Sequence, residues 1–480
     1  MVLAAAAAVR WWGLSDQPYD FHATRQLYDM LMARGFWADL GGTPPDGTLV
    51  ALTSARPPVL EPPVTQGFAA MVYLAAGHEA VGLVRGLLAL VWVAAAAPVF
   101  RTVHLATGRL VPAYAGAVVW LFMPLGVILS RSFQPDGLML ACIAWAVHAL
   151  LRNDLAEGRH RWSATLASSC AVFVKAPAVF FVVPVYVALR VSRDGFRSTL
   201  RRDTFAYLFC TVAPALAFLA SRHFTDAMQS QERGSFLPQL VLHGWFWSGW
   251  WHMAISVVGL FGLPVIALGL IVSRGRLRVV IAALLAGYVA FGLTFTYHYA
   301  THNYYHAPLL LVLALAVASV VAWALSGVPV AALRPRPVLV GVVAAVLLDV
   351  AISPSTPQAF AGAPKSWTSA RDQAVEIGRQ LDHATGVVFL SADYGHSLEE
   401  YGYLSGVAWP SRGDLRKEAL QGRPRLDVRA RLSELSEHEQ LRWFVVTERE
   451  ELAAQPELAA YLDSLAAPLR GDGWVAYRLS

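Results

Sequence analysis

The chain of 480 residues is 56% hydrophobic and 15% charged, whereas a soluble domain typically carries about 25% charged residues. With its long apolar runs, this deficit excludes an ordinary soluble protein and predicts a polytopic α-helical membrane protein. The formal net charge of +5 is modest and no basic run is interleaved with aromatic residues, so nothing indicates nucleic-acid binding. Three cysteines, all in apolar segments, give neither a disulfide framework nor a metal-ligand spacing.

The chain begins with a short apolar segment, followed by a polar stretch from Gly13 to Gly67. Residues 2–14 fall short of the roughly 20 residues that span a bilayer. Either this segment is tilted or the true start lies upstream of Met1. Within the polar stretch, residues 23–37 have helical spacing, with one apolar stripe and with three charged residues largely off it, namely Arg25, Asp29 and Arg34. This pattern predicts an amphipathic helix at the membrane interface.

The prolines of residues 44–63 forbid a regular helix, so that part is expected to be a loop. Residues 64–76 are expected to form a short apolar helix that dips back into the membrane. The spanning candidates that follow are residues 79–100, 110–129, 137–151, 162–174, 177–190, 204–221, 252–272, 279–297, 307–325 and 338–353. With the first segment, the expected number of spans is about eleven.

Loop charge predicts the orientation of these spans. Arginines gather in alternate loops, at positions 101, 109, 152, 159, 161, 190, 193, 197, 201, 202, 274, 276, 278, 334 and 336. Because Lys and Arg accumulate in cytoplasmic loops, these loops are expected to face the cytoplasm. The polar stretch near residues 16–61 and the segments 131–136, 175, 222–251 and 298–306 then share the outer face.

The tail from Pro354 to Ser480 has a different character, because charged residues return. Residues 386–391 and 443–447 are typical of short buried strands, and residues 369–381 and 450–465 of helices. This pattern predicts a small C-terminal α/β domain outside the membrane.

The outer-face residues combine carboxylates with cations and imidazoles. The carboxylates are Asp16, Asp20 and Glu61; the cations are Arg25, Arg131, Lys175 and Arg222; the remaining polar groups are His22, His298, His302, Tyr304, Tyr305 and His306. Charged side chains at membrane depth usually line a cavity. A carboxylate can remove a proton from an acceptor hydroxyl, and Arg or Lys can hold an anionic leaving group.

Five segments resemble the GT-C glycosyltransferases, in particular the group of the protein O-mannosyltransferases and the aminoarabinose transferase of lipid A. They are PYDFHATRQLYDMLMARGFW, LEPPVTQGFAAMVYLAAG, RSFQPDGLML, FVKAPAVFF and HNYYHAPLLLVLAL, and their order and spacing carry the resemblance over about residues 10–325. The resemblance implies a GT-C fold and transfer of a sugar from a polyprenyl-phosphate carrier, with inversion at the anomeric carbon, onto an acceptor on the outer face. The resemblance extends weakly to the tail, since many relatives carry an outer α/β domain.

The resemblance assigns roles unevenly. Arg25 matches a family arginine that contacts the donor phosphate. The family's Asp-Glu pair appears here as His22-Ala23, so the expected base is Asp20, with Asp16 further back. Asp20 is also well placed to be a helix N-cap. Glu61, ahead of a Pro-Pro pair, is expected to orient the acceptor or the base, and an exposed loop acid is the alternative.

Arg131 and Lys175 are further candidates for contact with the carrier phosphate. The alternatives are a salt bridge between Arg131 and Asp136 and a lysine that snorkels to the interface. The segment with His302, Tyr304, Tyr305 and His306 is expected to hydrogen-bond the same phosphate.

No metal or other cofactor is expected. His298, His302 and His306 would share one face of a helix, so a divalent metal is possible but not favoured. In the tail, Asp393, Tyr394, His396 and Glu400 are candidates for acceptor contact, with surface solvation as the alternative.

The sequence therefore predicts a transmembrane GT-C catalytic module at residues 1–353, with residues 13–67 as its first outer loop, and an extracytoplasmic α/β domain at residues 354–480. The expected partners are a polyprenyl-phosphate-linked sugar, a lipid, glycan or protein acceptor, and the bilayer of the cytoplasmic membrane. A transporter or flippase of lipid-linked intermediates, which would often show internal repeats, is one alternative. A GT-C scaffold without catalysis is the other.

Overall fold

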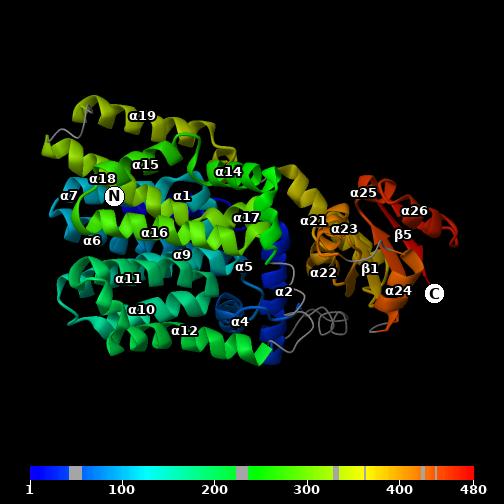
Figure 1. Cartoon of the computed structure of the whole chain (residues 1–480). Helices are drawn as coiled ribbons and strands as arrows, with labels where there is room; N and C mark the ends of the chain where they lie inside the picture. Colours follow the sequence, from blue (N-terminus) through cyan, green and yellow to red (C-terminus); the bar gives the residue numbers. More distant parts are fainter. Residues whose placement is uncertain are drawn as a thin grey trace. The chain divides into compact units, whose positions relative to one another are not determined.

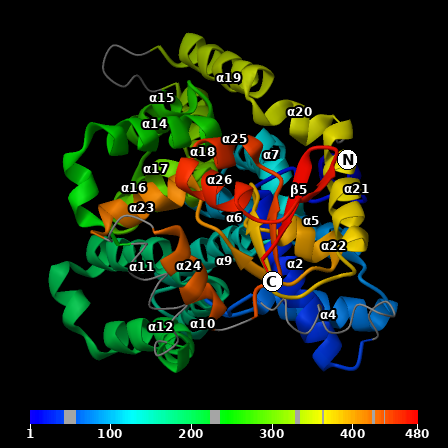
Figure 2. The ribbon, with the colours of Figure 1, turned by 90° about the vertical axis from the view of Figure 1, so that its right-hand side faces the viewer.

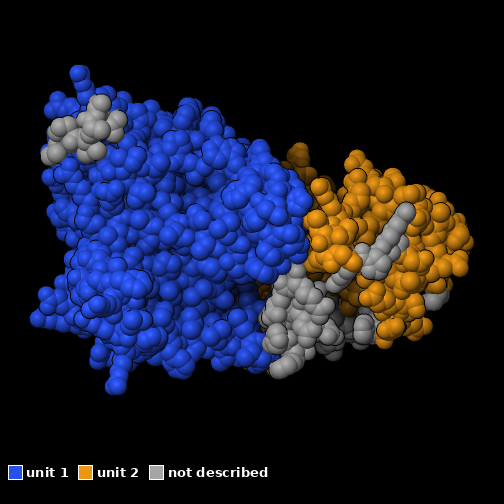
Figure 3. Space-filling model, viewed as in Figure 1, with its two compact units in different colours: residues 1–14, 60–65, 82–362 blue, residues 15–59, 66–81, 363–480 orange. Residues whose placement is uncertain are grey.

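The computed structural model describes residues 1–42, 57–222, 236–327, 334–361, 364–422, 427–437 and 440–479. Most of the expected loop 44–63 lies outside this part of the chain. The described chain divides into two compact units (Figure 3). Unit 1 comprises residues 1–14, 60–65 and 82–362, and unit 2 comprises residues 15–59, 66–81 and 363–480. Unit 2 thus takes in most of the first polar stretch as well as the tail.

Unit 1 is a bundle of helices (Figure 1). Its α-helices are α1 (Val2–Trp11), α5 (Val81–Ala94), α6 (Ala96–Thr107), α7 (Leu110–Phe122), α8 (Pro124–Arg131), α9 (Pro135–Leu155), α10 (Arg161–Val174), α11 (Val179–Asp194), α12 (Arg202–Arg222), α14 (Gly244–Val258), α15 (Gly262–Val272), α16 (Gly275–Thr294), α17 (Thr296–Thr301), α18 (Pro308–Ser326), α19 (Pro335–Ile352) and α20 (Ser355–Phe360). Its 3-10 turns are η1 (Ala176–Ala178), η2 (Phe196–Leu200), η3 (Pro238–Leu242) and η4 (Asn303–His306).

Within the described residues, seven helices are long and apolar enough to cross a membrane, or up to nine if each of two bent pairs is one span. The chain is therefore a multi-pass membrane protein, but the expected number of about eleven spans is not confirmed. Two expected spans are bent: α7 and α8 meet at 60°, and α14 and α15 at 80°. Proline and glycine explain the bends, because Pro124 begins α8 without an N–H and Gly259 has φ 84°.

Unit 2 combines six C-terminal helices with α2 (Ala23–Asp39) and nearly all of α4 (Val64–Ala76). The C-terminal helices are α21 (Lys365–Gln380), α22 (His396–Gly402), α23 (Arg412–Leu420), α24 (Val428–Ser436), α25 (Arg449–Ala453) and α26 (Pro456–Asp463). The strands are β1 (Val387–Leu390), β2 (Gly406–Ala408), β3 (Trp443–Val446), β4 (Leu469–Gly471) and β5 (Trp474–Arg478).

The sheet of unit 2 has the strand order β2-β1-β3-β5-β4. Strand β1 pairs in parallel with β2 and β3, while β5 is antiparallel to both β3 and β4. Alternate residues of β1 enter two different cores, with Val388 in one and Val387 in the other. The predicted α/β domain and its first and third strands are confirmed, and the predicted helix at 450–465 is two helices, since Pro456 starts α26.

One expectation for α2 is wrong. The helix covers the predicted residues, but it is not amphipathic in the way expected, because charged residues off the apolar stripe are buried too: Asp29 is fully buried and Arg34 is 4% exposed. Both are ion-paired inside unit 2, which is how their charges tolerate burial.

Candidate functional site

The predicted base, Asp20, lies in unit 2 immediately ahead of α2. Its side chain is buried, and Gln26 Nε2 donates to Asp20 Oδ1 at 3.1 Å. The N-cap of α2 is His22, which adopts the left-handed conformation with φ 46° and makes no side-chain capping hydrogen bond. The alternative role of Asp20 as the helix cap is therefore wrong. Asp16 lies in the same unit and is partly buried.

Arg25, on the first turn of α2, is held by a carboxylate that the sequence analysis did not assign to the site. Asp29 Oδ2 lies 3.4 Å from Arg25 Nε, and Gln66 Nε2 donates to Asp29 Oδ1 at 2.6 Å. The guanidinium also lies 5.5 Å from the ring centroid of Tyr28. Arg25 remains 21% exposed although Asp29 is buried, so its charge is fixed in place yet reachable. The signal that could have found Asp29 was its i, i+4 spacing from Arg25.

A second ion cluster in unit 2 joins three segments that are distant in sequence. Arg34 donates to both carboxylate oxygens of Glu79, at 2.7 and 2.8 Å, and to Glu400 Oε1 at 2.7 Å. Its guanidinium also faces the ring of Tyr403 at 5.1 Å. Glu400 is 3% exposed, so this predicted acceptor contact is instead part of the ionic core.

Burial and the presence of two carboxylates beside one guanidinium both affect the pKa values of this cluster. Burial raises the pKa of Glu400 to about 8; Arg34 opposes the shift, and Glu79 adds to it. Burial disfavours the charge on Arg34, but Glu400 and Glu79 outweigh that effect and raise its pKa.

Unit 2 also contains a cavity of about 260 Å³ at the carboxyl ends of parallel strands β1 and β3. Its polar lining consists of Tyr19, Thr24, Gln373, Ser391, Asp393, Ser397, Thr447 and Glu448. The Tyr19 hydroxyl lies 3.0 Å from Ser397 Oγ, and Asp393 Oδ2 accepts from the Ser397 backbone N–H at 2.9 Å. Burial, and then the neighbouring Asp393, raises the pKa of Glu448. Ligands of open α/β sheets bind at this end of the strands, next to the point where strand order reverses.

In unit 1, Lys175 is buried at the end of α10 and is paired with Asp136. Its Nζ lies 2.8 Å from both oxygens of the Asp136 carboxylate. It also lies 5.3 and 5.9 Å from the ring centroids of Tyr304 and Tyr305. The structure thus brings together three of the predicted phosphate ligands, and the snorkelling alternative for Lys175 is wrong because the ammonium is buried.

Arg131 is held by backbone carbonyls within unit 1. Its guanidinium donates to the backbone carbonyls of Trp12 at 2.8 Å and Gln358 at 2.6 Å. The alternative of a salt bridge to Asp136 is wrong, because Asp136 is the partner of Lys175. Arg131 is 3% exposed, and its expected contact with the carrier phosphate stays a prediction. Glu61, also in unit 1, is partly buried and lies three residues ahead of α4.

The histidine segment of unit 1 does not form one helix face. Helix α17 ends at Thr301, and His302 is extended, with φ −130° and ψ 112°. His306 is fully buried; its Nδ1 lies 2.6 Å from the Tyr288 hydroxyl and its Nε2 lies 2.8 Å from the Tyr299 carbonyl oxygen. Both ring nitrogens are thereby used within the bundle, which argues against the expected phosphate contact of His306. His302 is less buried, and its Nδ1 lies 2.7 Å from Thr301 Oγ1.

Within the described ranges, no three His, Cys, Asp or Glu side chains come together as a metal site. The helical face that would have supported a histidine site is also missing, since the backbone turns at His302.

No protein-family model and no curated protein sequence matches this chain. Solved structures do. ArnT from Cupriavidus metallidurans in the apo state is 14% identical, with a TM-score of 0.56 over 99% of this chain and 97% of that chain. The same protein bound to undecaprenyl phosphate gives 14% identity and a TM-score of 0.55, again over 99% and 97% of the two chains. The oligosaccharyltransferase AglB from Archaeoglobus fulgidus, in complex with an inhibitory peptide and a dolichol-phosphate, is 13% identical with a TM-score of 0.53, over 100% of this chain and 74% of that chain.

These similarities define the class of the protein by its fold. The chain has the fold of the GT-C glycosyltransferases, as the sequence predicted. At this level of identity the similarity establishes the fold alone, and the roles of individual residues stay predictions.

Proposed function

We propose that the protein is an inverting glycosyltransferase, which moves a sugar from a polyprenyl-phosphate carrier to a hydroxyl acceptor at the outer face of the cytoplasmic membrane. The observation that carries this proposal is the GT-C fold over 99% of the chain, shared with an ArnT structure bound to undecaprenyl phosphate. Ionic groups held by hydrogen bonds or ion pairs at the predicted positions of Asp20, Arg25 and Lys175 support it.

In the proposed reaction, Asp20 takes the proton of the acceptor hydroxyl, and the acceptor oxygen attacks the anomeric carbon of the sugar. The bond between that carbon and the phosphate oxygen breaks, and polyprenyl phosphate leaves as the anion. Attack from the side opposite the phosphate inverts the anomeric carbon. The hydrogen bond from Gln26 orients the Asp20 carboxylate.

Arg25 is proposed to stabilise the departing phosphate. Its guanidinium is oriented by Asp29, which Gln66 holds in turn, so little reorganisation is needed when phosphate charge develops. Arg25 offers several donors in a planar fork that matches a phosphate.

Lys175, with Tyr304 and Tyr305, is proposed as a phosphate contact within unit 1. Asp136 neutralises Lys175 at rest, so phosphate would have to share the ammonium with that carboxylate. The two phenol rings around Lys175 supply hydrogen-bond donors and exclude water.

The acceptor is proposed to contact unit 2 at the cavity lined by Tyr19, Asp393 and Glu448. Carboxylates and hydroxyls around an aromatic ring suit a polyhydroxylated acceptor, because sugar hydroxyls donate to carboxylates while their C–H faces pack on rings.

The test is transfer of label from a polyprenyl-phosphate sugar in membranes that contain the full-length protein. Asp20→Asn should lower turnover by about 10²- to 10⁴-fold, which is the usual contribution of a general base. Asp39→Asn is the matched control, the same substitution at the exposed end of α2, and should keep turnover. Turnover like that of wild type in a folded Asp20→Asn protein would remove the base assignment.

Arg25→Ala should separate the phosphate role from the base role. It should weaken use of the donor by about tenfold or more, because a charge-assisted contact is lost. Full donor use by Arg25→Ala would contradict the assignment of Arg25 while leaving that of Asp20 intact.

A further inference from the structure

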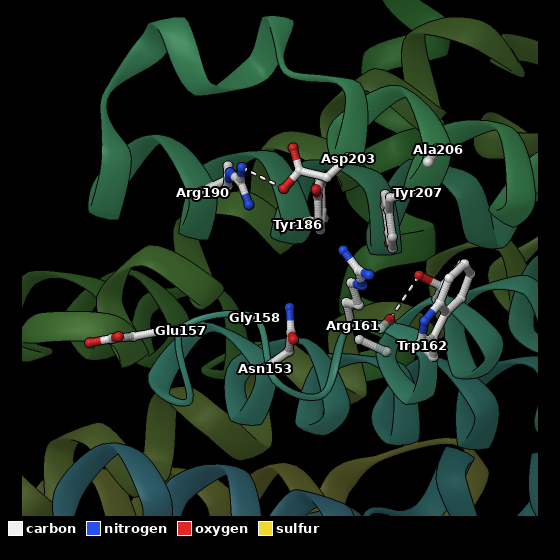
Figure 4. Close-up of a pocket in the computed structure, with 12 residues that line it drawn as sticks. Asn153, Glu157, Gly158, Arg161, Trp162, Tyr186, Arg190, Asp203, Ala206 and Tyr207 are labelled. Carbon is white, nitrogen blue, oxygen red and sulfur yellow. Dashed lines mark hydrogen bonds and ion pairs between the residues drawn. The ribbon is translucent and has the colours of Figure 1, made fainter.

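Unit 1 has a cavity of about 280 Å³ at the arginine-rich end of its helices, formed by α9, α10, α11, α12 and the turn after α9 (Figure 4). Helices α10, α11 and α12 lie side by side in Figures 1 and 2, and Tyr207 on α12 donates to Ser168 Oγ on α10 at 2.9 Å. The cavity does not overlap the residues proposed above for catalysis, so it invites a separate explanation.

The cavity is lined by two arginines and two acidic residues, and the two arginines are arranged differently. Arg190 is compensated twice, by Asp203 at 2.7 Å and by Asp194 at 3.2 Å. Arg161, in contrast, forms no ion pair with any residue that the structure describes, and its guanidinium lies 5.6 Å from the ring centroid of Trp162. Figure 4 shows Arg161 directed into the space near Tyr207, whereas Glu157 points away. The cavity therefore presents one guanidinium, that of Arg161, that no carboxylate among the described residues holds in an ion pair.

A second donor faces the same space. Asn153 Oδ1 accepts a hydrogen bond from the backbone N–H of His160 at 3.1 Å, which fixes the orientation of the amide. Its amide nitrogen is then the end that points into the cavity in Figure 4. A guanidinium and an amide N–H₂ aimed at one space suit the oxygens of a phosphate.

Large apolar side chains are exposed on two of the helices that form the cavity. On α10, Trp162 is 68% exposed and Leu166, one turn further, is 66% exposed. On α12, Phe205 and Phe209 are 57% and 71% exposed at the same four-residue spacing. Tryptophan beside arginine is typical of the level of lipid headgroups, with apolar side chains beyond it at the level of acyl chains.

The wider surroundings favour an anion as well. The segments from residue 152 to 161 and from residue 190 to 203 contain eight arginines and four acidic residues. Juxtamembrane basic clusters attract anionic lipids, and basic pockets between membrane helices bind their headgroups.

From these contacts, we propose that this cavity is a binding site for an anionic phospholipid. The phosphate lies against Arg161 and the Asn153 amide, and the acyl chains lie along Trp162 and Leu166. This site holds a lipid of the surrounding bilayer and is distinct from the proposed carrier site.

The test compares phosphatidylglycerol with phosphatidylcholine as ligands of the detergent-solubilised full-length protein, by native mass spectrometry and by thermal shift. Wild type should bind phosphatidylglycerol about tenfold more tightly than phosphatidylcholine. Arg161→Gln should weaken phosphatidylglycerol binding by about tenfold or more, the usual effect of losing one charge-assisted contact. Arg197→Gln is the matched control: Arg197 is an exposed arginine of η2 that does not line the cavity, and its loss should change affinity less than twofold.

Three results would overturn the proposal. Equal losses in Arg161→Gln and Arg197→Gln would mean diffuse attraction to a basic surface. Equal binding of phosphatidylcholine would mean that no charge is recognised, and equal binding of inorganic phosphate would mean that acyl chains play no part. If Arg161→Gln fails to fold, Ala206→Phe decides, since Ala206 is exposed and its enlargement fills the cavity without changing charge. Unchanged phosphatidylglycerol binding by Ala206→Phe would also reject the site.

Discussion

The two units bury ionic groups in contrasting ways. In unit 1, Lys175 faces one carboxylate, that of Asp136, with two phenol rings beside it. In unit 2, Arg34 faces two carboxylates, those of Glu79 and Glu400. A one-to-one pair has no net charge, so removing both of its members leaves no charge buried. A one-to-two cluster keeps its ion pairs only while all three segments stay together, so it is expected to stabilise their packing.

The largest expected effect is the loss of stability when the ion cluster of Arg34 in unit 2 is broken. Arg34→Leu leaves the buried Glu400 and the partly buried Glu79 without their cation, and removing one partner of a buried pair typically costs about 3–5 kcal/mol. Thermal unfolding and hydrogen exchange of α2 and α22 measure the loss. Arg371→Leu is the control, because Arg371 is 40% exposed and its pair with Asp372 contributes about 0–1 kcal/mol. Equal stability of Arg34→Leu and wild type would show that this cluster does not hold unit 2 together.

In unit 1, the loss of stability caused by removing Lys175 should be reversed by a second substitution. Lys175→Met leaves Asp136 buried and unpaired, at a cost of about 3 kcal/mol, while the double variant Lys175→Met with Asp136→Leu should recover most of the stability because no charge stays buried. Sugar transfer should be lost in both variants if Lys175 contacts the carrier phosphate. A double variant that stays as unstable as the single one would mean that packing, not charge, explains the loss.

The charge imbalance in unit 2 also predicts a dependence of stability on pH. The pKa of Glu400 is about 8 in the folded protein, whereas an unperturbed glutamate, as in the unfolded chain, has a pKa near 4.5. Between pH 4.5 and pH 8 the folded state therefore binds the proton more tightly than the unfolded chain. The contribution to stability is fully present below pH 4.5 and is lost as the pH rises through 8, by up to a few kcal/mol. Glu400→Gln should flatten this slope in thermal unfolding between pH 5 and 9.

The control for this titration is Glu434→Gln, which changes a glutamate that is 63% exposed. Its slope should match that of wild type. A wild-type protein whose stability rises between pH 5 and 9 would contradict the assigned direction.

The sequence predicted the parts of the molecule that depend on local pattern, and it missed those that depend on distant partners. Residues 64–76 form the expected helix because apolar composition and the preceding prolines decide it locally. The sequence could not decide which residue pairs with Asp136. Arg131 is near in sequence, whereas Lys175 comes close only through the packing of α9 and α10.

The same reasoning explains what was missed in unit 2. Arg34 and Glu400 are 366 residues apart, so no spacing rule connects them. Strands β2 and β4 have three residues each, too few for an alternating pattern to stand out. Asp20 and Arg25 were assigned through the family resemblance, and their roles stay predictions that the transfer assay must decide.

The smallest expected effects concern glycines at which two backbone segments approach closely. Each unit has such a glycine, although their ionic cores differ. A Cβ at Gly287 of α16 would lie 1.8 Å from the Phe180 carbonyl oxygen, and one at Gly378 of α21 would lie 2.0 Å from the Gly402 carbonyl oxygen. Gly287→Ala and Gly378→Ala should therefore each cost about 1–3 kcal/mol in thermal unfolding, since backbone must move apart. Gly341→Ala meets nothing within 4 Å and has a helical position in α19, so it should be neutral or slightly stabilising. If Gly287→Ala matched Gly341→Ala, the close approach of α11 and α16 would not be required, and the two units would differ in packing as well as in charge.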